Sequence, residues 1–263
     1  MRALGLALLL CACHGAASAA RQPAIGLIID DMGYDLVHGR QALALTGPLT
    51  YAFIPGTPRT PVLAREAHAR GKEIMVHLPM EADNGRLLDV GGLKRAMSGR
   101  ELRAAVAAGV AGVPHAVGVN NHMGSLLTRD AGAMEPVMAA LAAGPYYFVD
   151  SRTSPDSVAE RVALDYGLPA TRRDVFLDNE RDEAYIEAQW ERLIRKAVEQ
   201  GSAVGIAHPY PETLAVLRRC LPKLAERGVG LLPISRIIER QQRLPLWHAS
   251  SFPSPRVAKN SKP

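Results

Sequence analysis

Two adjacent carboxylates, Asp30 and Asp31, end the first long apolar run that follows the N-terminal segment. A single aspartate after a strand usually caps a helix, because its side chain accepts a backbone N–H. Two neighbouring carboxylates repel each other unless a proton or a cation separates them. The pair is therefore interpreted as part of a chemical site.

Histidines at two other positions could share a cation with this pair. His77 ends one apolar run, and His122 follows another. Each of them alone is as consistent with a buried structural histidine as with a metal ligand. Together with Asp31 they form an Asp/His/His set, which is typical of a divalent metal site and favours zinc.

Two further polar groups fit catalysis, and each has a structural alternative. His208 could act as a proton donor, or it could hold the turn that Pro209 begins. Arg152 could contact the reacting groups, or it could pair with Asp150 as a structural clamp. The choice depends on which elements carry these residues.

Short apolar runs that follow glycine-terminated helical patterns predict a buried parallel sheet. Glycine just past a helix end accepts the left-handed conformation that closes the helix. Short apolar runs with little alternation are typical of strands buried on both faces. The expected strands are residues 25–30, 49–54, 73–77, 116–120, 146–150, 171–177, 203–207 and 229–234.

The clearest helix is predicted over residues 182–200, where apolar side chains recur at helical spacing. The stripe that faces the core is expected to contain Ile186, Trp190, Leu193, Ala197 and Val198.

Strands that alternate with helices predict an α/β fold, an irregular (β/α) barrel of seven or eight mostly parallel strands in a single domain. An open, doubly wound sheet is the alternative. Polar residues follow the carboxyl end of nearly every expected strand. In a β/α barrel these ends converge on one face, where active sites form. The Asp/His/His set and His208 are therefore expected to meet.

Other chemistries lack support in the sequence. There is no Gly-x-Ser-x-Gly nucleophile elbow and no phosphate-binding loop. Cys220 has no histidine near it in the sequence, which argues against a thiol nucleophile. The net charge is +5 and no basic run is interleaved with aromatic residues, so nucleic-acid binding is not expected.

The two ends of the chain are expected to lie outside the fold. Residues 1–19 resemble a signal peptide, with a cleavage site at Ala17-Ser18-Ala19, and their apolar run is too short for a transmembrane span. The alternative is a lipoprotein signal that ends before Cys13, which would anchor the protein through a lipid. Either reading predicts export to the periplasm. Residues 241–263 predict a disordered basic tail.

Six short motifs, in this order, resemble the divergent polysaccharide deacetylase family over about residues 24–238. They are residues 29–34 (IDDMGY), 77–81 (HLPME), 119–125 (VNNHMGS), 150–153 (DSRT), 173–178 (RDVFLD) and 208–213 (HPYPET). The resemblance implies a β/α barrel of the glycoside hydrolase/deacetylase kind, which would occupy residues 24–240.

The resemblance also implies roles for individual residues. Asp30 matches the catalytic base of polysaccharide deacetylases, Asp31 matches a metal ligand, and His208 matches the catalytic acid. His77 matches the first of two metal histidines, and Glu81 stands where the second would be. His122 has no clear counterpart in the wider polysaccharide deacetylases, and neither their Arg-Pro-Tyr motif nor their aspartate-tryptophan motif is reproduced.

The resulting hypothesis is a metal-dependent N- or O-deacetylase that acts on a cell-envelope polysaccharide such as peptidoglycan. Arg152 would orient Asp30 or the acetyl oxygen, with Asp150 beside it, and Asn121 and Ser125 could bind sugar hydroxyls. The alternative is an inactive envelope factor that uses the same barrel to bind a glycan or a protein partner.

Overall fold

The computed structural model describes residues 22–242. The predicted signal segment at residues 1–19, with its lipoprotein alternative at Cys13, lies outside this range. So does the predicted tail, except that the last helix runs to Gln242. Within residues 22–242, no helix has both the length and the apolar character needed to cross a membrane.

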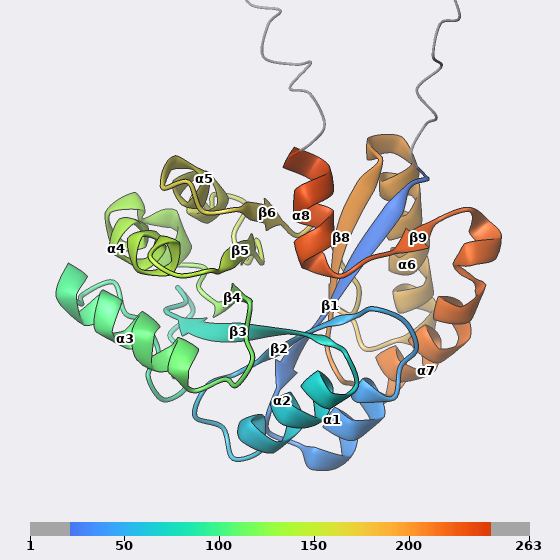
Figure 1. The fold of residues 1–263 in the computed structure, drawn as a ribbon, viewed down its shortest axis with the longest axis horizontal. Helices are drawn as coiled ribbons and strands as arrows, with labels where there is room; N and C mark the ends of the chain where they lie inside the picture. The colour runs from blue at the N-terminus through green and yellow to red at the C-terminus, as the bar shows by residue number, and fades with distance from the viewer. Residues whose placement is uncertain (1–21, 243–263) are drawn as a thin grey trace, which may run out of the picture.

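A single curled sheet of parallel strands forms the centre of the described chain (Figure 1). Its strands are β1 (Ala24–Met32), β2 (Thr50–Phe53), β3 (Glu73–Met80), β4 (Gly118–Met123), β5 (Tyr147–Asp150), β6 (Ala170–Arg172), β7 (Val175–Phe176), β8 (Ser202–Ala207) and β9 (Gly230–Leu231). They lie in the order β6-β5-β4-β3-β2-β1-β8-β7, with β9 paired to β1. The predicted fold class, a single α/β domain built on an irregular barrel, is confirmed.

The strand predicted at residues 171–177 is wrong in one respect, because this segment forms two short strands at opposite edges of the sheet. β6 pairs with β5, and β7 pairs with β8. Between them, the Arg173 N–H donates to Asp150 O (2.9 Å) and the Asp174 N–H donates to Val204 O (2.8 Å). The segment therefore spans the gap between the two edges and brings the sheet close to closure.

Eight α-helices connect and cover the strands in the described range, with α1 to α7 around the outside of the sheet (Figure 1). They are α1 (Leu36–Leu43), α2 (Thr60–Ala69), α3 (Gly99–Ala111), α4 (Ala131–Ala142), α5 (Ala159–Asp165), α6 (Glu183–Gln200), α7 (Pro211–Cys220) and α8 (Ile234–Gln242).

Side chains on the two faces of the sheet form two separate apolar clusters. Outward residues of β1, such as Ile25 and Leu27, join the core beneath the outer helices. Inward residues, such as Ile28, pack against Ile234 and Ile237 of α8. α8 thus fills the interior of the half-barrel at the amino ends of the strands. Inward-facing positions further along the strands carry polar residues. These residues lie at the opposite end of the half-barrel, at the carboxyl ends of the strands.

Helix α6 begins and ends as the sequence predicts. The Asp182 side chain accepts the N–H of Tyr185 at the start, and Gly201 closes the end with φ 84°. The predicted stripe needs one correction, because Val198 is 58% exposed while Ile194 is buried in its place.

We expect Trp190→Ala to lower the free energy of unfolding by about 3–5 kcal/mol, because it leaves a large cavity in the core beneath α6. Trp190 is 2% exposed. Val198→Ala on the same helix removes an exposed side chain and is expected to change stability by less than about 0.5 kcal/mol. Urea unfolding followed by circular dichroism measures both, and equal losses would contradict this account of the helix.

Candidate functional site

An irregularity in β1 brings both aspartates to the same side of the sheet. β1 runs through Met32, so Asp30 and Asp31 lie within the strand rather than after it. Its register with β2 shifts between Ile29 and Met32, and Asp31 has φ 54°. Adjacent residues of a regular strand point to opposite faces, and a bulge removes this alternation. Asp30 Oδ2 and Asp31 Oδ1 consequently lie 3.6 and 3.2 Å from His77 Nε2.

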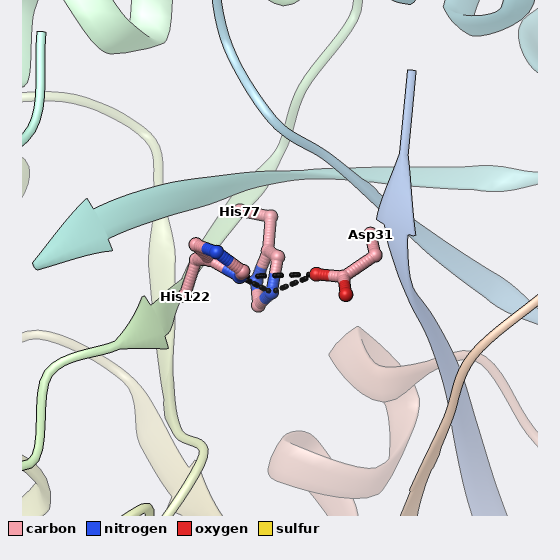
Figure 2. A group of neighbouring side chains, drawn as sticks. All are labelled: Asp31, His77 and His122. Atoms are coloured by element: carbon pink, nitrogen blue, oxygen red, sulfur yellow. Dashed lines mark hydrogen bonds and ion pairs between the residues drawn. The ribbon is translucent and has the colours of Figure 1, made fainter. Parts of the chain in front are cut away.

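Three side chains from three strands point at one another (Figure 2). Asp31 Oδ1 lies 3.2 Å from His77 Nε2 and 3.0 Å from His122 Nδ1, and the two nitrogens are 3.1 Å apart. Zinc–ligand bonds of about 2.0–2.1 Å separate tetrahedral ligand atoms by about 3.3 Å. The three atoms thus have nearly the spacing that a tetrahedral ion requires.

Asn120 determines which nitrogen of His77 faces this point. Its amide nitrogen donates to Asp30 Oδ1 (2.8 Å), so its oxygen faces His77 Nδ1 (2.8 Å). The Nδ1–H must then donate to that oxygen, so in the neutral ring the lone pair is on Nε2. A hydrogen-bonded outer nitrogen is the usual arrangement for a metal-binding histidine.

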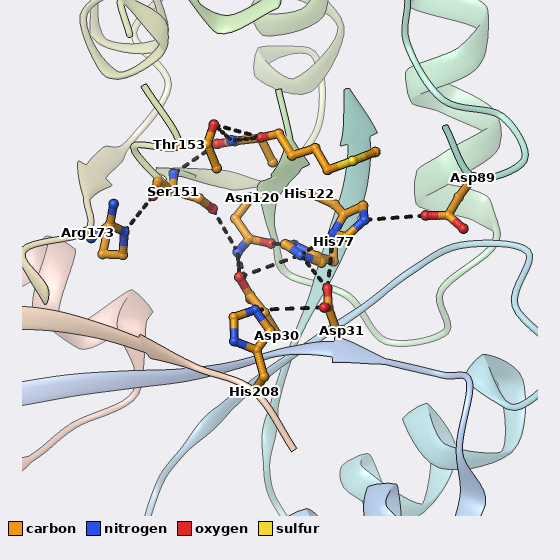
Figure 3. Close-up of polar contacts among 12 residues, drawn as sticks. Asp30, Asp31, His77, Asp89, Asn120, His122, Ser151, Thr153, Arg173 and His208 are labelled. Atoms are coloured by element: carbon orange, nitrogen blue, oxygen red, sulfur yellow. Dashed lines mark hydrogen bonds and ion pairs between the residues drawn. The ribbon is translucent and has the colours of Figure 1, made fainter. Parts of the chain in front are cut away.

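His122 has a similar outer partner. Its Nε2 lies 3.4 Å from Asp89 Oδ2, on the loop after β3, and its Nδ1 faces Asp31. Asp89 also accepts a hydrogen bond from the Tyr34 hydroxyl. This contact orients the imidazole as the Asn120 contact orients His77 (Figure 3).

The donor set fits a divalent cation. Asp31 Oδ1 is buried and accepts no hydrogen bond from the residues that the structure describes. Burial opposes the charge of this carboxylate, but His122 and His77 outweigh burial and hold its pKa well below the ordinary value. Two imidazole lone pairs and a carboxylate oxygen at this spacing repel one another unless a proton or a cation lies among them.

His208 lies on the other side of Asp31 as a cationic group. Its Nε2 is 3.8 Å from Asp31 Oδ2, and its Nδ1–H donates to Asp178 Oδ1 (2.9 Å). Burial alone would lower the pKa of His208, but Asp178, with smaller contributions from Asp31 and Asp30, outweighs burial and raises the pKa to about 9. Thr213 also donates to Asp178, which fixes the carboxylate (2.8 Å). His208 is therefore protonated at neutral pH and can release a proton from Nε2.

Asp30 is the most deeply placed of the charged groups. It is 2% exposed, and burial raises the pKa of its carboxyl above the ordinary value. Asn120 donates to both of its oxygens, at 2.8 and 3.1 Å. A carboxylate whose pKa is raised by burial binds a proton more readily than an exposed one, which suits a general base.

Three predicted residues lie near the centre but are engaged elsewhere. Glu81 Oε2 accepts the N–H of Arg95 (2.7 Å), and Glu81 is not among the three converging ligands. The Arg152 guanidinium donates to the carbonyls of Pro155 and Ser157 rather than to Asp30. Asp150 accepts the backbone N–H of Arg152 (2.8 Å), so the two form a structural clamp through the backbone.

The two residues predicted to contact sugar hydroxyls have different surroundings. Asn121 is fully buried, donates to Met123 O (2.7 Å) and accepts the N–H of Ser151 (2.9 Å). Ser125 donates to Asp83 Oδ1 (2.7 Å) and lines an open groove. Only Ser125 is therefore placed where a ligand could reach it.

Strained backbone is concentrated around this centre. Non-glycine residues with positive φ in the described range are Asp31, Met123, Arg152 and His115. The first three lie at the carboxyl ends of β1, β4 and β5, next to the converging side chains. Each such residue costs on the order of 1–3 kcal/mol, and strain of this kind clusters at functional sites.

We expect Asp178→Asn to lower the pKa of His208 from about 9 toward the ordinary value of 6.5, because the ion pair that opposes desolvation is removed. Imidazole titration by NMR on metal-free protein measures the change. The control is Asp35→Asn, at the exposed carboxylate beside His38, which should leave His208 unaffected. An unchanged pKa in Asp178→Asn would contradict the role assigned to Asp178.

Comparison with known proteins identifies the family of this chain. A family model described as divergent polysaccharide deacetylase matches residues 27–238. The chain belongs to this family. It is 37% identical over 218 residues to the uncharacterised protein YibQ of Escherichia coli, across 83% of this chain and 68% of YibQ. An uncharacterised Haemophilus influenzae protein is 35% identical over 224 residues, covering 85% and 80% of the two chains.

Solved structures share the fold. The uncharacterised protein ATU2773 of Agrobacterium tumefaciens superposes with a TM-score of 0.80 at 23% identity, covering 84% of this chain and 91% of that one. A mutant of BA3943 from Bacillus anthracis, described as a CE4 family pseudoenzyme with restored enzymatic activity, gives 0.51 at 15% identity, covering 83% and 68%. Family and fold are those of polysaccharide deacetylases.

Proposed function

We propose that this protein is a metal-dependent deacetylase that removes N- or O-acetyl groups from a cell-envelope polysaccharide such as peptidoglycan. One observation carries the proposal: Asp31, His77 and His122 converge within 3.0–3.2 Å of one another, and Asp30 and His208 flank them. The family supplies the reaction class.

The residues divide the chemistry between them. A divalent cation held by Asp31, His77 and His122 would polarise the acetyl carbonyl and lower the pKa of water. Asp30 accepts the proton of the attacking water, because its raised pKa makes it the stronger base of the two aspartates. His208, which Asp178 keeps protonated, donates its Nε2 proton to the departing amine or alkoxide. Zinc is the ion that this ligand set favours.

The proposed location is the periplasm. The apolar run and small-residue cleavage site in residues 1–19 support export, and a lipid anchor at Cys13 is the alternative form of the same proposal. Mass spectrometry of the mature N-terminus separates cleavage after Ala19 from acylation of Cys13. An uncleaved N-terminus in the cytoplasmic fraction would contradict both.

Acetate release tests the activity. Zinc-loaded protein is incubated with acetylated substrates, namely chitotetraose, purified peptidoglycan and O-acetylated xylan, and acetate is measured enzymatically. We expect release from at least one of them and none from Asp31→Asn protein. Folded, metal-loaded protein that releases no acetate from any substrate would contradict the proposal.

A second candidate is an envelope factor that binds a glycan or a protein partner without turnover. Glu81, which stands where the wider polysaccharide deacetylases have their second metal histidine, accepts a hydrogen bond from the Arg95 N–H and does not join the converging ligands. Pelleting with insoluble peptidoglycan distinguishes the candidates. Binding that persists in His77→Ala and His122→Ala, without acetate release by the unaltered protein, would favour the factor.

A further inference from the structure

A groove of about 630 Å³ opens beside the Asp/His/His centre. The loops after β3, β4 and β5, the strand β7 and the helix α6 form its walls. Phe176, in its lining, lies 5.1 Å from the His208 ring, so the groove reaches the candidate acid. A polymer that placed one unit at the centre would therefore have neighbouring units in contact with this groove.

Four arginines line the groove: Arg86, Arg152, Arg173 and Arg192. Asp174 is the one carboxylate in its lining, and its Oδ2 already accepts the N–H of Val204 (2.9 Å). Within residues 22–242, none of the four guanidinium groups forms an ion pair with an acidic side chain. Four arginines against one carboxylate leave this concavity with an excess of positive charge, which attracts an anion.

Arg152 and Arg173, the two inner arginines, are held in place by hydrogen bonds to backbone carbonyls. Arg173 donates to the carbonyls of Ser151 (2.6 Å) and Arg152 (2.7 Å), and it lies over the ring of Phe176. Ser151 Oγ accepts the Asn120 amide, which in turn bonds Asp30 (Figure 3). The wall of the groove and the candidate base thus belong to one hydrogen-bonded unit.

The two outer arginines have side chains free to meet a ligand. Arg86 lies on the exposed loop after β3, and Arg192 lies on the exposed side of α6. Guanidinium groups bind carboxylates and phosphates through paired N–H donors, which gives orientation as well as affinity. A neutral acetylated glycan would leave these four charges without an anionic partner.

We infer that this groove binds an anionic group of the glycan, a carboxylate or a phosphate, on a sugar unit next to the one that carries the acetyl group. The inference rests on the proposed function for the glycan and for the reaction. It adds that the substrate is an acidic polysaccharide and that Arg86 and Arg192 select it.

Isothermal titration calorimetry on full-length, metal-free protein tests the inference with paired probes. A tetrasaccharide of alternating N-acetylglucosamine and glucuronic acid is compared with chitotetraose, and chitobiose that carries a 6-phosphate on its second unit is compared with unmodified chitobiose. We expect each acidic probe to bind at least about tenfold more tightly than its neutral pair. The stronger of the two preferences identifies carboxylate or phosphate as the source. High salt should reduce the preference, because it screens charge.

The double variant Arg86→Gln, Arg192→Gln should lose about tenfold in affinity for the preferred acidic probe and nothing for its neutral pair. The matched control is Arg195→Gln, an exposed arginine three residues further along α6 that does not line the groove. Equal binding of acidic and neutral probes, no binding of either, or an equal loss in the control would overturn the inference.

Failure of this inference and failure of the proposed function are distinguishable, because the calorimetry needs neither metal nor turnover. Acid-selective binding without acetate release would support the anion-binding groove and contradict the proposed deacetylase activity. Acetate release from chitotetraose without acid selectivity would do the reverse.

Discussion

His77→Ala is expected to abolish the binding of one divalent cation per chain. The alanine removes Nε2, which lies 3.2 Å from Asp31 Oδ1 and 3.1 Å from His122 Nδ1, and two ligands remain where three converge. Elemental analysis after zinc loading and desalting measures the loss. A cation that binds only the folded protein stabilises it by about 2.7 kcal/mol at a hundredfold excess over Kd. Added zinc should therefore raise the melting temperature of the unaltered protein and not that of the variant.

Three companion variants make this result specific. His122→Ala is expected to lose the cation as well, because it removes the third ligand. Glu81→Gln should retain it, since that carboxylate is bonded to the Arg95 N–H. His68→Ala removes an exposed histidine of α2 outside the site and should also retain it. Stoichiometric zinc in both His77→Ala and His122→Ala would show that the centre is not a metal site.

Asp30→Asn is expected to keep the cation but to lower kcat by about 10²–10⁴-fold, the contribution usual for a general base. Asparagine has nearly the same shape and can still accept a hydrogen bond from Asn120, so the site should stay in place. Zinc content and acetate release, measured on the same sample, separate the two effects. Asp31→Asn is the contrasting variant and should lose both.

Asp30→Asn should also make the metal-free protein more stable at neutral pH. Burial raises the pKa of Asp30 in the folded state, so the folded protein is destabilised once this carboxyl ionises, above its unfolded pKa near 3.8. An uncharged asparagine avoids that cost. Thermal melts at pH 7 and at pH 4 measure the gain, which should shrink at the lower pH. A variant that retains full turnover, or that is less stable at pH 7, would contradict the role assigned to Asp30.

The fold was predictable because its signals are local. Apolar runs mark the strands, and Gly201 with Asp182 marks the two ends of α6. The division of residues 171–177 into β6 and β7 was not predictable, because it depends on how far the two edges of the sheet lie apart. The sequence of this segment alone does not determine that distance.

The strand ends that carry the candidate site were predictable from the sequence. Which side chains at those ends face the centre was less predictable. Asp31, His77 and His122 were chosen from ligand chemistry, and the structure brings them together. Asn121 was chosen where Asn120 faces the centre, although strand alternation places Asn120 and His122 on one face. That signal was available in the sequence. Asp89 lies on a long loop without periodicity, and no pattern pointed to it.

The left-handed backbone of Asp31, Met123 and Arg152 has a consequence for how this protein would evolve. Glycine adopts that conformation without steric cost, so replacing any of the three is the easiest local route to relaxed backbone. A population selected for heat tolerance alone should accumulate glycine at these positions, and at Asp31 it would lose the carboxylate that the three-ligand centre needs. Selection for activity and selection for thermal stability therefore favour different residues at these strand ends.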